Sequence, residues 1–288
     1  MECPENTNLP LFAYGLFKPG QLCYSRIKHF VEKYEKCEIS GSLLERDGIP
    51  LIVENDHGEV VGYLITFKKG DEEKAYQSIA GIEPKKIYKW GVAESGNNIA
   101  NVLYGRNPDK GSCHIHEGWK GEGCNIAARE WDGNKDPFFT QSLDLVREML
   151  NESEKKEHEG AFGNYKELFR LQMAYTLLWS AIERYAGLKY HLGDQVMNKV
   201  SRIAEEECFI ESLKCVVKEK RIIYRSDNLK KETLDLNNPK KAISYYYAVR
   251  SNSIHRGKNA IGDFRIVQSS LRELLEIFTK MLEDAFKE

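Results

Sequence analysis

The hydrophobic period changes once along the chain, and this change constrains the fold more than any other feature. Up to about residue 106 the apolar residues stand in short runs bounded by Gly, Pro, Asn or Asp, which is typical of strands and turns. After about residue 140 they recur at spacings of three and four, the helical period. The 288 residues are also about twice a common domain length. The sequence therefore predicts a strand-rich domain at 8–106, a glycine-rich connector at 107–140 and an all-helical domain at 141–288.

The strand-rich part contains six expected strands and two expected helices. The helices are expected at 25–34 and 71–80, and the strands at 10–17, 38–46, 50–55, 59–67, 88–95 and 98–105. Short turns and few helices argue against a parallel doubly wound sheet. They favour a small, mostly antiparallel β-barrel.

The second part is predicted to be an all-α bundle, which makes the whole chain an α+β protein. Pro239 suits the first position of a helix, and Gly257 suits its end. The helical segments are expected at 142–150, 164–187, 197–225, 239–256 and 263–286.

Composition limits the compartment and the cofactors. The apolar runs are far shorter than the roughly 18 residues that cross a bilayer, so no membrane partner is expected. The first residues lack the basic and apolar regions of a signal peptide, and seven scattered cysteines indicate free thiols. We expect a cytoplasmic protein that needs no cofactor and no metal. Zinc at Cys113, His114, His116 and Cys124 stays open as an alternative, although their spacing is not that of a standard zinc finger.

Two features of the first part belong together chemically. Tyr14, Gly15, Leu16 and Phe17 form a turn directly after an apolar strand, where successive backbone N–H groups can hold a carboxylate or an oxyanion. Glu83 follows the second expected helix. A carboxylate between apolar walls has a raised pKa and can serve as a general base.

These residues resemble the gamma-glutamylcyclotransferase-like (AIG2-like) family, in which Y-G-x-L-x-x-G ends the first strand. The resemblance covers about residues 10–106 and implies that Glu83 deprotonates the α-amine of a γ-glutamyl group, which then cyclises and releases 5-oxoproline. It also implies that Tyr14 to Phe17 bind this small metabolite through their backbone. Departures from the family pattern leave open a barrel that binds without turnover; they are Phe17, Ala80, Pro84 and Lys89.

The second part carries Arg250 and His255, five residues apart on an expected helix. Five residues turn a regular helix by about 500°, so the two side chains point about 140° apart. They converge only if the helix end unwinds or if a second chain supplies the partner. The segment Lys214–Lys258 holds 12 basic and 4 acidic residues, a net charge of +8. Such a stretch fits either a polyanion-binding surface or an ordinary solvated face.

This segment resembles the R-x(4-6)-H motif of HEPN domains, many of which are metal-independent endoribonucleases that work as dimers. The resemblance spans about residues 140–288 and implies acid–base catalysis by His255 at the ribose 2′-hydroxyl, with Arg250 stabilising the phosphorane. Ser251, Asn252, Arg256 and Lys258 are then expected to contact RNA.

The sequence therefore leads to three hypotheses. The first is a homodimeric HEPN-type ribonuclease whose barrel regulates it or binds a γ-glutamyl-like ligand, with a role as a toxin in stress or phage defence. The second is a cyclotransferase-type acyl-transfer enzyme that dimerises through its helical domain. The third is a binding protein without catalysis.

Overall fold

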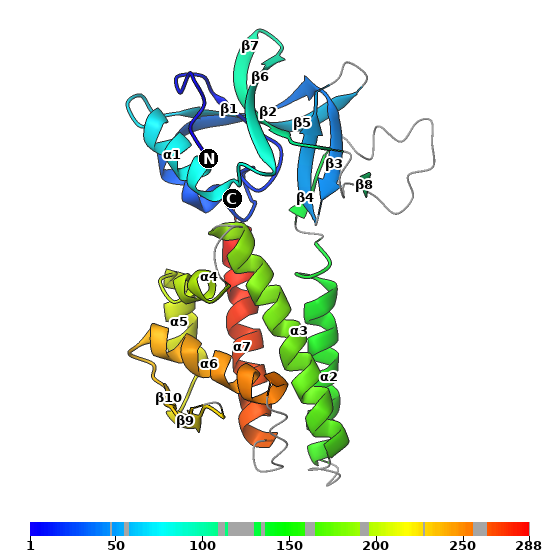
Figure 1. Cartoon of the computed structure of the whole chain (residues 1–288), viewed down its shortest axis with the longest axis vertical. Helices are drawn as coiled ribbons and strands as arrows, with labels where there is room; N and C mark the ends of the chain where they lie inside the picture. The colour runs from blue at the N-terminus through cyan, green and yellow to red at the C-terminus, as the bar shows by residue number, and fades with distance from the viewer. Residues whose placement is uncertain are drawn as a thin grey trace. The chain divides into compact units, whose positions relative to one another are not determined.

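The computed structural model describes a mixed α+β protein. The described residues are 1–46, 48–54, 58–108, 113–114, 130–133, 136–158, 165–190, 196–226, 228–255 and 264–287; at 113–114, 157–158, 196–197 and 254–255 only the backbone is described. The chain divides into two compact units (Figure 1). Unit 1 comprises Met1–Asp136, Leu188–Gly193 and Ala285–Glu288, and unit 2 comprises Pro137–Gly187 and Asp194–Asp284.

Unit 1 is built on one curled sheet. Its strands are β1 (Leu11–Ala13), β2 (Val31–Ser40), β3 (Ser42–Arg46), β4 (Ile49–Val53), β5 (Glu59–Phe67), β6 (Tyr88–Ser95), β7 (Asn98–Gly105) and β8 (Cys113–His114). Their order is β2-β5-β1-β7-β4-β3-β8, and β6 pairs with β7 outside this path. Strand β1 runs parallel to β7, as does β4, whereas the other described pairs are antiparallel. The sheet is therefore mostly antiparallel, and it curls as a half-barrel does (Figure 1).

Helix α1 (Glu72–Ile82) is held to this sheet by a buried tyrosine on its inner face. The Tyr76 hydroxyl donates to the carbonyl of Leu9 at 2.8 Å and accepts from Nδ2 of Asn101 at 3.0 Å. Its ring packs edge-on against Phe67 and Trp90. These contacts fix the position of the C-terminal end of α1, from which Glu83 projects.

Three predicted strands are confirmed and one predicted helix is wrong. The ranges 59–67, 88–95 and 98–105 are β5, β6 and β7. The range 25–34 is not a helix: short 3₁₀ turns at Tyr24–Arg26 and Lys28–Phe30 lead into β2. The apolar residues of 25–34 have a helical spacing. From Val31 on, however, the backbone is hydrogen-bonded to β5, and this pairing is not visible in the sequence spacing.

The other three predicted strands differ at their ends. The range 50–55 corresponds to β4, which begins one residue earlier and ends at Val53. The range 10–17 shortens to β1 because the chain turns after Ala13. The range 38–46 breaks at Gly41, whose φ of +153° favours glycine, so that it contributes to both β2 and β3.

Unit 2 contains six helices among its described residues. They are α2 (Gln141–His158), α3 (Tyr165–Lys189), α4 (Val196–Ile203), α5 (Glu207–Val216), α6 (Pro239–His255) and α7 (Phe264–Ala285). Helix α6 begins at Pro239 as predicted, and Oδ1 of Asn238 accepts a hydrogen bond from the N–H of Lys241 at 3.0 Å, which caps the helix. Large aromatic side chains fill the core between these helices, among them Tyr175, Trp179, Tyr185, Phe209, Tyr245, Tyr246 and Phe278.

The prediction of a purely helical second half is wrong in one segment. The range 197–225 forms α4 and α5, and then the strand β9 (Arg221–Tyr224), which pairs antiparallel with β10 (Lys231–Leu234). In β9 Ile223 is buried while its neighbours Ile222 and Tyr224 are exposed. This alternation is the period of a strand, and β-branched and aromatic residues favour it. None of the helices in the described part of the chain is both long and apolar enough to cross a membrane.

Candidate functional site

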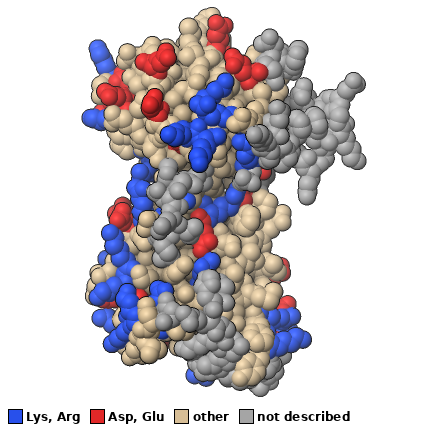
Figure 2. Space-filling view, viewed as in Figure 1, with Lys and Arg blue, Asp and Glu red and all other residues tan. Residues whose placement is uncertain are grey.

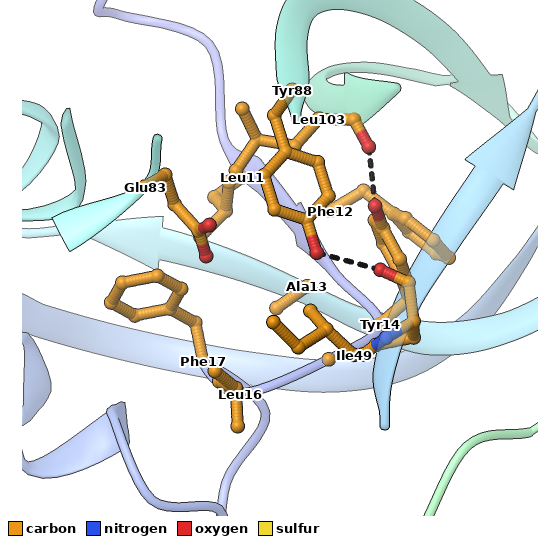
Figure 3. A pocket seen from close by; sticks show the side chains of 12 residues that line it. Leu11, Phe12, Ala13, Tyr14, Leu16, Phe17, Ile49, Glu83, Tyr88 and Leu103 are labelled. Atoms are coloured by element: carbon orange, nitrogen blue, oxygen red, sulfur yellow. Dashed lines mark hydrogen bonds between the residues drawn. The ribbon is translucent and has the colours of Figure 1, made fainter. Parts of the chain in front are cut away.

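Glu83 lies at the C-terminal end of α1, where the chain turns from helix to extended backbone. Its N–H still donates to the carbonyl of Ile79 at 2.9 Å, while its own φ of −78° and ψ of 126° are extended. The side chain points into a cavity of about 30 Å³, room for about one or two water molecules (Figure 3). The walls come from β1, the turn after it, the start of β4, the start of β6 and the end of β7; they are Leu11 to Phe17, Ile49, Pro50, Tyr88 and Leu103.

The two tyrosine hydroxyls in these walls donate to backbone carbonyls and not to the carboxylate. The Tyr14 hydroxyl donates to the carbonyl of Leu103, and the Tyr88 hydroxyl donates to the carbonyl of Pro50 at 2.7 Å (Figure 3). Among the described residues, no hydrogen bond or ion pair ends on the carboxylate of Glu83. The residue is nevertheless only 7% exposed. It is therefore a buried acid without a compensating partner in the described structure, which is uncommon in proteins.

Burial raises the pKa of Glu83 to about 8, and the positive amino terminus of the chain lowers it by a smaller amount. Desolvation disfavours the charged form of a carboxyl group, and no nearby donor offsets it. The pKa values of Tyr14 and Tyr88 are also raised, first by burial and then by the charge of Glu83. Near neutral pH the carboxyl group of Glu83 can both accept and donate a proton.

The turn after β1 lines the same cavity and contains backbone N–H groups without a described acceptor. A Cβ atom on Gly15 would lie 2.7 Å from Cγ of Pro50, so the close approach of these two segments requires glycine. The turn is closed by the N–H of Lys18, which donates to the carbonyl of Gly15 at 3.0 Å. Within the described structure, the N–H groups of Leu16 and Phe17 donate to no other residue. They are available for an anionic ligand.

The structure thus places five sequence-predicted residues around one cavity: Tyr14, Gly15, Leu16, Phe17 and Glu83. Sequence reasoning missed Ile49, Pro50, Tyr88 and Leu103. One sequence feature could have indicated Tyr88: it is the first residue of a predicted strand that begins five residues after Glu83. Side chains alternate along a strand, so every second residue from Tyr88 faces the same side as Tyr88.

Arg250 lies on α6 and is held against α3. Its Nη2 is 3.1 Å from Oε1 of Glu183, and its guanidinium lies 5.4 Å from the ring centre of Tyr247. That ring packs edge-on against Trp179. The ion pair and the ring fix the guanidinium in one place, since a cation over an aromatic face is attracted to it.

The rest of the predicted motif is only partly described. Helix α6 continues without interruption to His255, so the convergence of Arg250 and His255 through an unwound helix end does not occur before that residue. The side chain of His255 and the residues Arg256 and Lys258 lie outside the described structure. Ser251 is half-buried.

Asn252 is buried and its amide group is used within unit 2. Nδ2 donates to the carbonyl of Tyr224 at 2.9 Å, and Oδ1 accepts from the N–H of Ser226 at 2.8 Å and from its hydroxyl at 2.6 Å. These bonds tie α6 to the end of β9. The geometry therefore favours a structural role for Asn252, rather than the predicted contact with RNA.

The zinc alternative cannot be placed. His116 and Cys124 lie outside the described residues, and only the backbone of Cys113 and His114 is described, in β8. Among the described side chains no group of three or more His, Cys, Asp or Glu could hold a metal ion.

Comparisons with known proteins add little to this geometry. No protein-family model matches the chain, and no similar curated protein was found. A search of solved structures found an uncharacterised protein, PH0828, from Pyrococcus horikoshii, which is 17% identical. The match covers 34% of this chain and 77% of that one with a TM-score of 0.29, a likeness too weak to support a fold assignment.

Proposed function

We propose that unit 1 is a proton-transfer site of the gamma-glutamylcyclotransferase type, built on a barrel of that family, and that it acts on a small γ-glutamyl compound. One observation carries the proposal: Glu83, a buried acid without a described partner, shares a cavity with the free N–H groups of Leu16 and Phe17. A general base and an oxyanion site within one cavity are the two parts that acyl transfer needs.

The reaction follows from these parts. The carboxylate of Glu83 removes a proton from the α-amine, and the amine nitrogen attacks the γ-carbonyl carbon and closes a five-membered ring. The N–H groups of Leu16 and Phe17 stabilise the oxyanion. The bond to the leaving amine then breaks, and the leaving nitrogen takes the proton from Glu83. The products are 5-oxoproline and a free amine. Because the cavity at Glu83 holds only about 30 Å³, its walls must move apart to admit the γ-glutamyl group.

The test is release of 5-oxoproline by the purified full-length protein from a panel of γ-glutamyl amines and amino acids. Glu83→Gln removes the base and should lower the rate by about 10² to 10⁴. The control is Glu94→Gln, which neutralises an exposed acid of β6 and should leave the rate unchanged. The wild-type rate should also fall about tenfold per pH unit below the pKa of Glu83, about 8. Full activity of Glu83→Gln would exclude this role.

We propose a second function for unit 2, as a HEPN-like bundle with dimeric, metal-independent ribonuclease activity, for which unit 1 would serve as the ligand-binding regulator. The supporting observation is the continuous helix α6: residues five apart on a regular helix point about 140° apart, so a second chain would supply the histidine that meets Arg250. Cleavage of RNA should survive EDTA and disappear in Arg250→Ala and in His255→Ala. Lys166→Ala, a change of one exposed charge on α3 outside the basic segment, serves as the control. If no RNA is cleaved and Glu83→Gln has no effect, both sites serve in binding alone.

A further inference from the structure

Glu83 also belongs to the wall of a second, larger cavity in unit 1. This cavity has a volume of about 670 Å³, within the roughly 300 to 1,000 Å³ of ordinary ligand sites. We call it the basic cavity; it is lined by Met1, Glu2, Cys3, Glu83, Pro84, Lys85, Lys86, Lys89, Trp90 and Arg106. The small cavity and the basic cavity therefore share one carboxyl group.

Four basic side chains meet in the basic cavity because of how β6 and β7 pair. The N–H of Ile87 donates to the carbonyl of Pro84 at 2.9 Å and closes a turn that carries Lys85 and Lys86. The N–H of Arg106 donates to the carbonyl of Ile87 at 2.7 Å. This bond holds the residue that follows β7 beside that turn. Lys89 lies in β6, one residue after the pair Tyr88–Gly105.

These four basic side chains form no ion pair in the described structure. Lys85, Lys86 and Lys89 form no ion pair with any described residue, and Nε of Arg106 donates to the carbonyl of Tyr88 at 3.0 Å. The acids in the lining are Glu2 and Glu83, and Glu83 is largely protonated near neutral pH. Figure 2 shows Lys and Arg side chains on this face of unit 1, with Asp and Glu side chains beside them. Clustered like charges in a concave site repel one another unless an anion binds among them.

We infer that the basic cavity binds the leaving part of the substrate and that this part is anionic, carrying carboxylate or phosphate groups. That the bound molecule is a substrate rests on the proposed function of Glu83. The anion-binding site itself is inferred from the lysines alone. The γ-glutamyl group would occupy the small cavity, and Glu83 would lie at the junction where the amide bond breaks. A γ-glutamyl amino acid or a γ-glutamyl derivative of a phosphorylated amine fits this arrangement, whereas a neutral γ-glutamyl amine leaves the cations uncompensated.

Binding of simple anions tests the site without turnover. Glutarate and inorganic phosphate would be titrated separately into the full-length protein by calorimetry, at low and at physiological salt. The triple variant Lys85→Ser, Lys86→Ser, Lys89→Ser should bind the preferred anion about tenfold more weakly or worse. The control Lys33→Ser, Lys69→Ser, Lys74→Ser removes the same charge from exposed positions of unit 1 outside the cavity lining and should bind within twofold of wild type. Stronger binding of glutarate indicates a carboxylate tail, and stronger binding of phosphate a phosphorylated one. Equal losses in the two triple variants, or no saturable binding to wild type, would overturn the inference.

Kinetics then separate this inference from the function it builds on. With γ-glutamylglutamate the lysine variant should show a KM raised about tenfold and an unchanged kcat, and with γ-glutamylmethylamide neither should change. If neither compound is turned over but an anion binds at the lysines, the cyclotransferase proposal fails and the anion site stands. If both compounds are turned over equally well by wild type and by the lysine variant, the cyclotransferase proposal stands and the anionic leaving part is wrong.

Discussion

Each unit contains a glutamate that is largely shielded from solvent, Glu83 in unit 1 and Glu273 in unit 2, and the two differ in what surrounds them. Glu83 in unit 1 is 7% exposed and faces a cavity, with no described partner for its carboxylate. The side chain of Glu273 in unit 2 is 13% exposed and forms an ion pair with Arg221, while the Tyr246 hydroxyl donates to it at 2.9 Å. Burial raises the pKa of both, but Arg221 and the tyrosine pull the pKa of Glu273 back down.

The comparison shows how the same residue type serves two purposes. A buried acid whose charge is matched by neighbours joins parts of the fold, because losing one member leaves the other uncompensated. A buried acid with no match weakens the native state whenever it is ionised. Acids with such raised pKa values are frequent at sites of proton transfer, and for this reason we propose Glu83 as the proton-transfer residue.

The largest effect on stability is expected at Glu273. Glu273→Gln removes the negative charge and leaves the guanidinium of Arg221, whose side chain is 14% exposed, without its ion-pair partner. The free energy of unfolding at pH 7 should fall by about 3 to 5 kcal/mol, measured by urea denaturation. A fall below about 1 kcal/mol would break the comparison, because Glu273 would then not be a structural acid.

The opposite sign is expected at Glu83. The native carboxyl group keeps its proton up to about pH 8, whereas its ordinary value is 4.5, so rising pH penalises the native state alone. Glu83→Gln should therefore raise the free energy of unfolding by about 3 kcal/mol at pH 7 and by about zero at pH 4. The gain should grow between those two pKa values and be constant above them. A destabilised variant at pH 9 would show that Glu83 has a partner.

The smallest change is expected when the whole pair in unit 2 is replaced. Glu273→Leu combined with Arg221→Met removes both charges and keeps apolar bulk in the core, which is often close to neutral. The free energy of unfolding should lie within about 1 to 2 kcal/mol of wild type, although Glu273→Gln alone costs more. If the double variant were as unstable as Glu273→Gln, the stabilising partner of Glu273 would be the Tyr246 hydroxyl and not Arg221.

Prediction from sequence succeeded where a local pattern matched the final environment. In β5 to β7 the runs of β-branched and aromatic residues between turn residues were enough, and Pro239 marked the start of α6 correctly. It failed at 25–34 and at β9. In both places backbone pairing overrode the local spacing: β2 pairs with β5, which is distant in sequence, and β9 pairs with β10, the next strand along the chain.

The candidate site shows the same division. The residue types at Tyr14 to Phe17 and at Glu83 could be picked out from the chain, and so could the motif residue Arg250. The basic cavity could not, because Lys85 and Arg106 meet only through the pairing of β6 with β7. The buried role of Asn252 was equally hidden, since its partners lie on another element.

By itself, the sequence determined the change from strand to helical period, the positions of most elements and the identity of the acid. Backbone preference and side-chain alternation are local, and they can be read from neighbouring residues. Only the tertiary structure decided that Glu83 is buried without a described partner while Glu273 is paired, and that unpaired lysines lie beside Glu83. A pKa depends on the dielectric and the donors around a group, and segments far apart in the chain supply both.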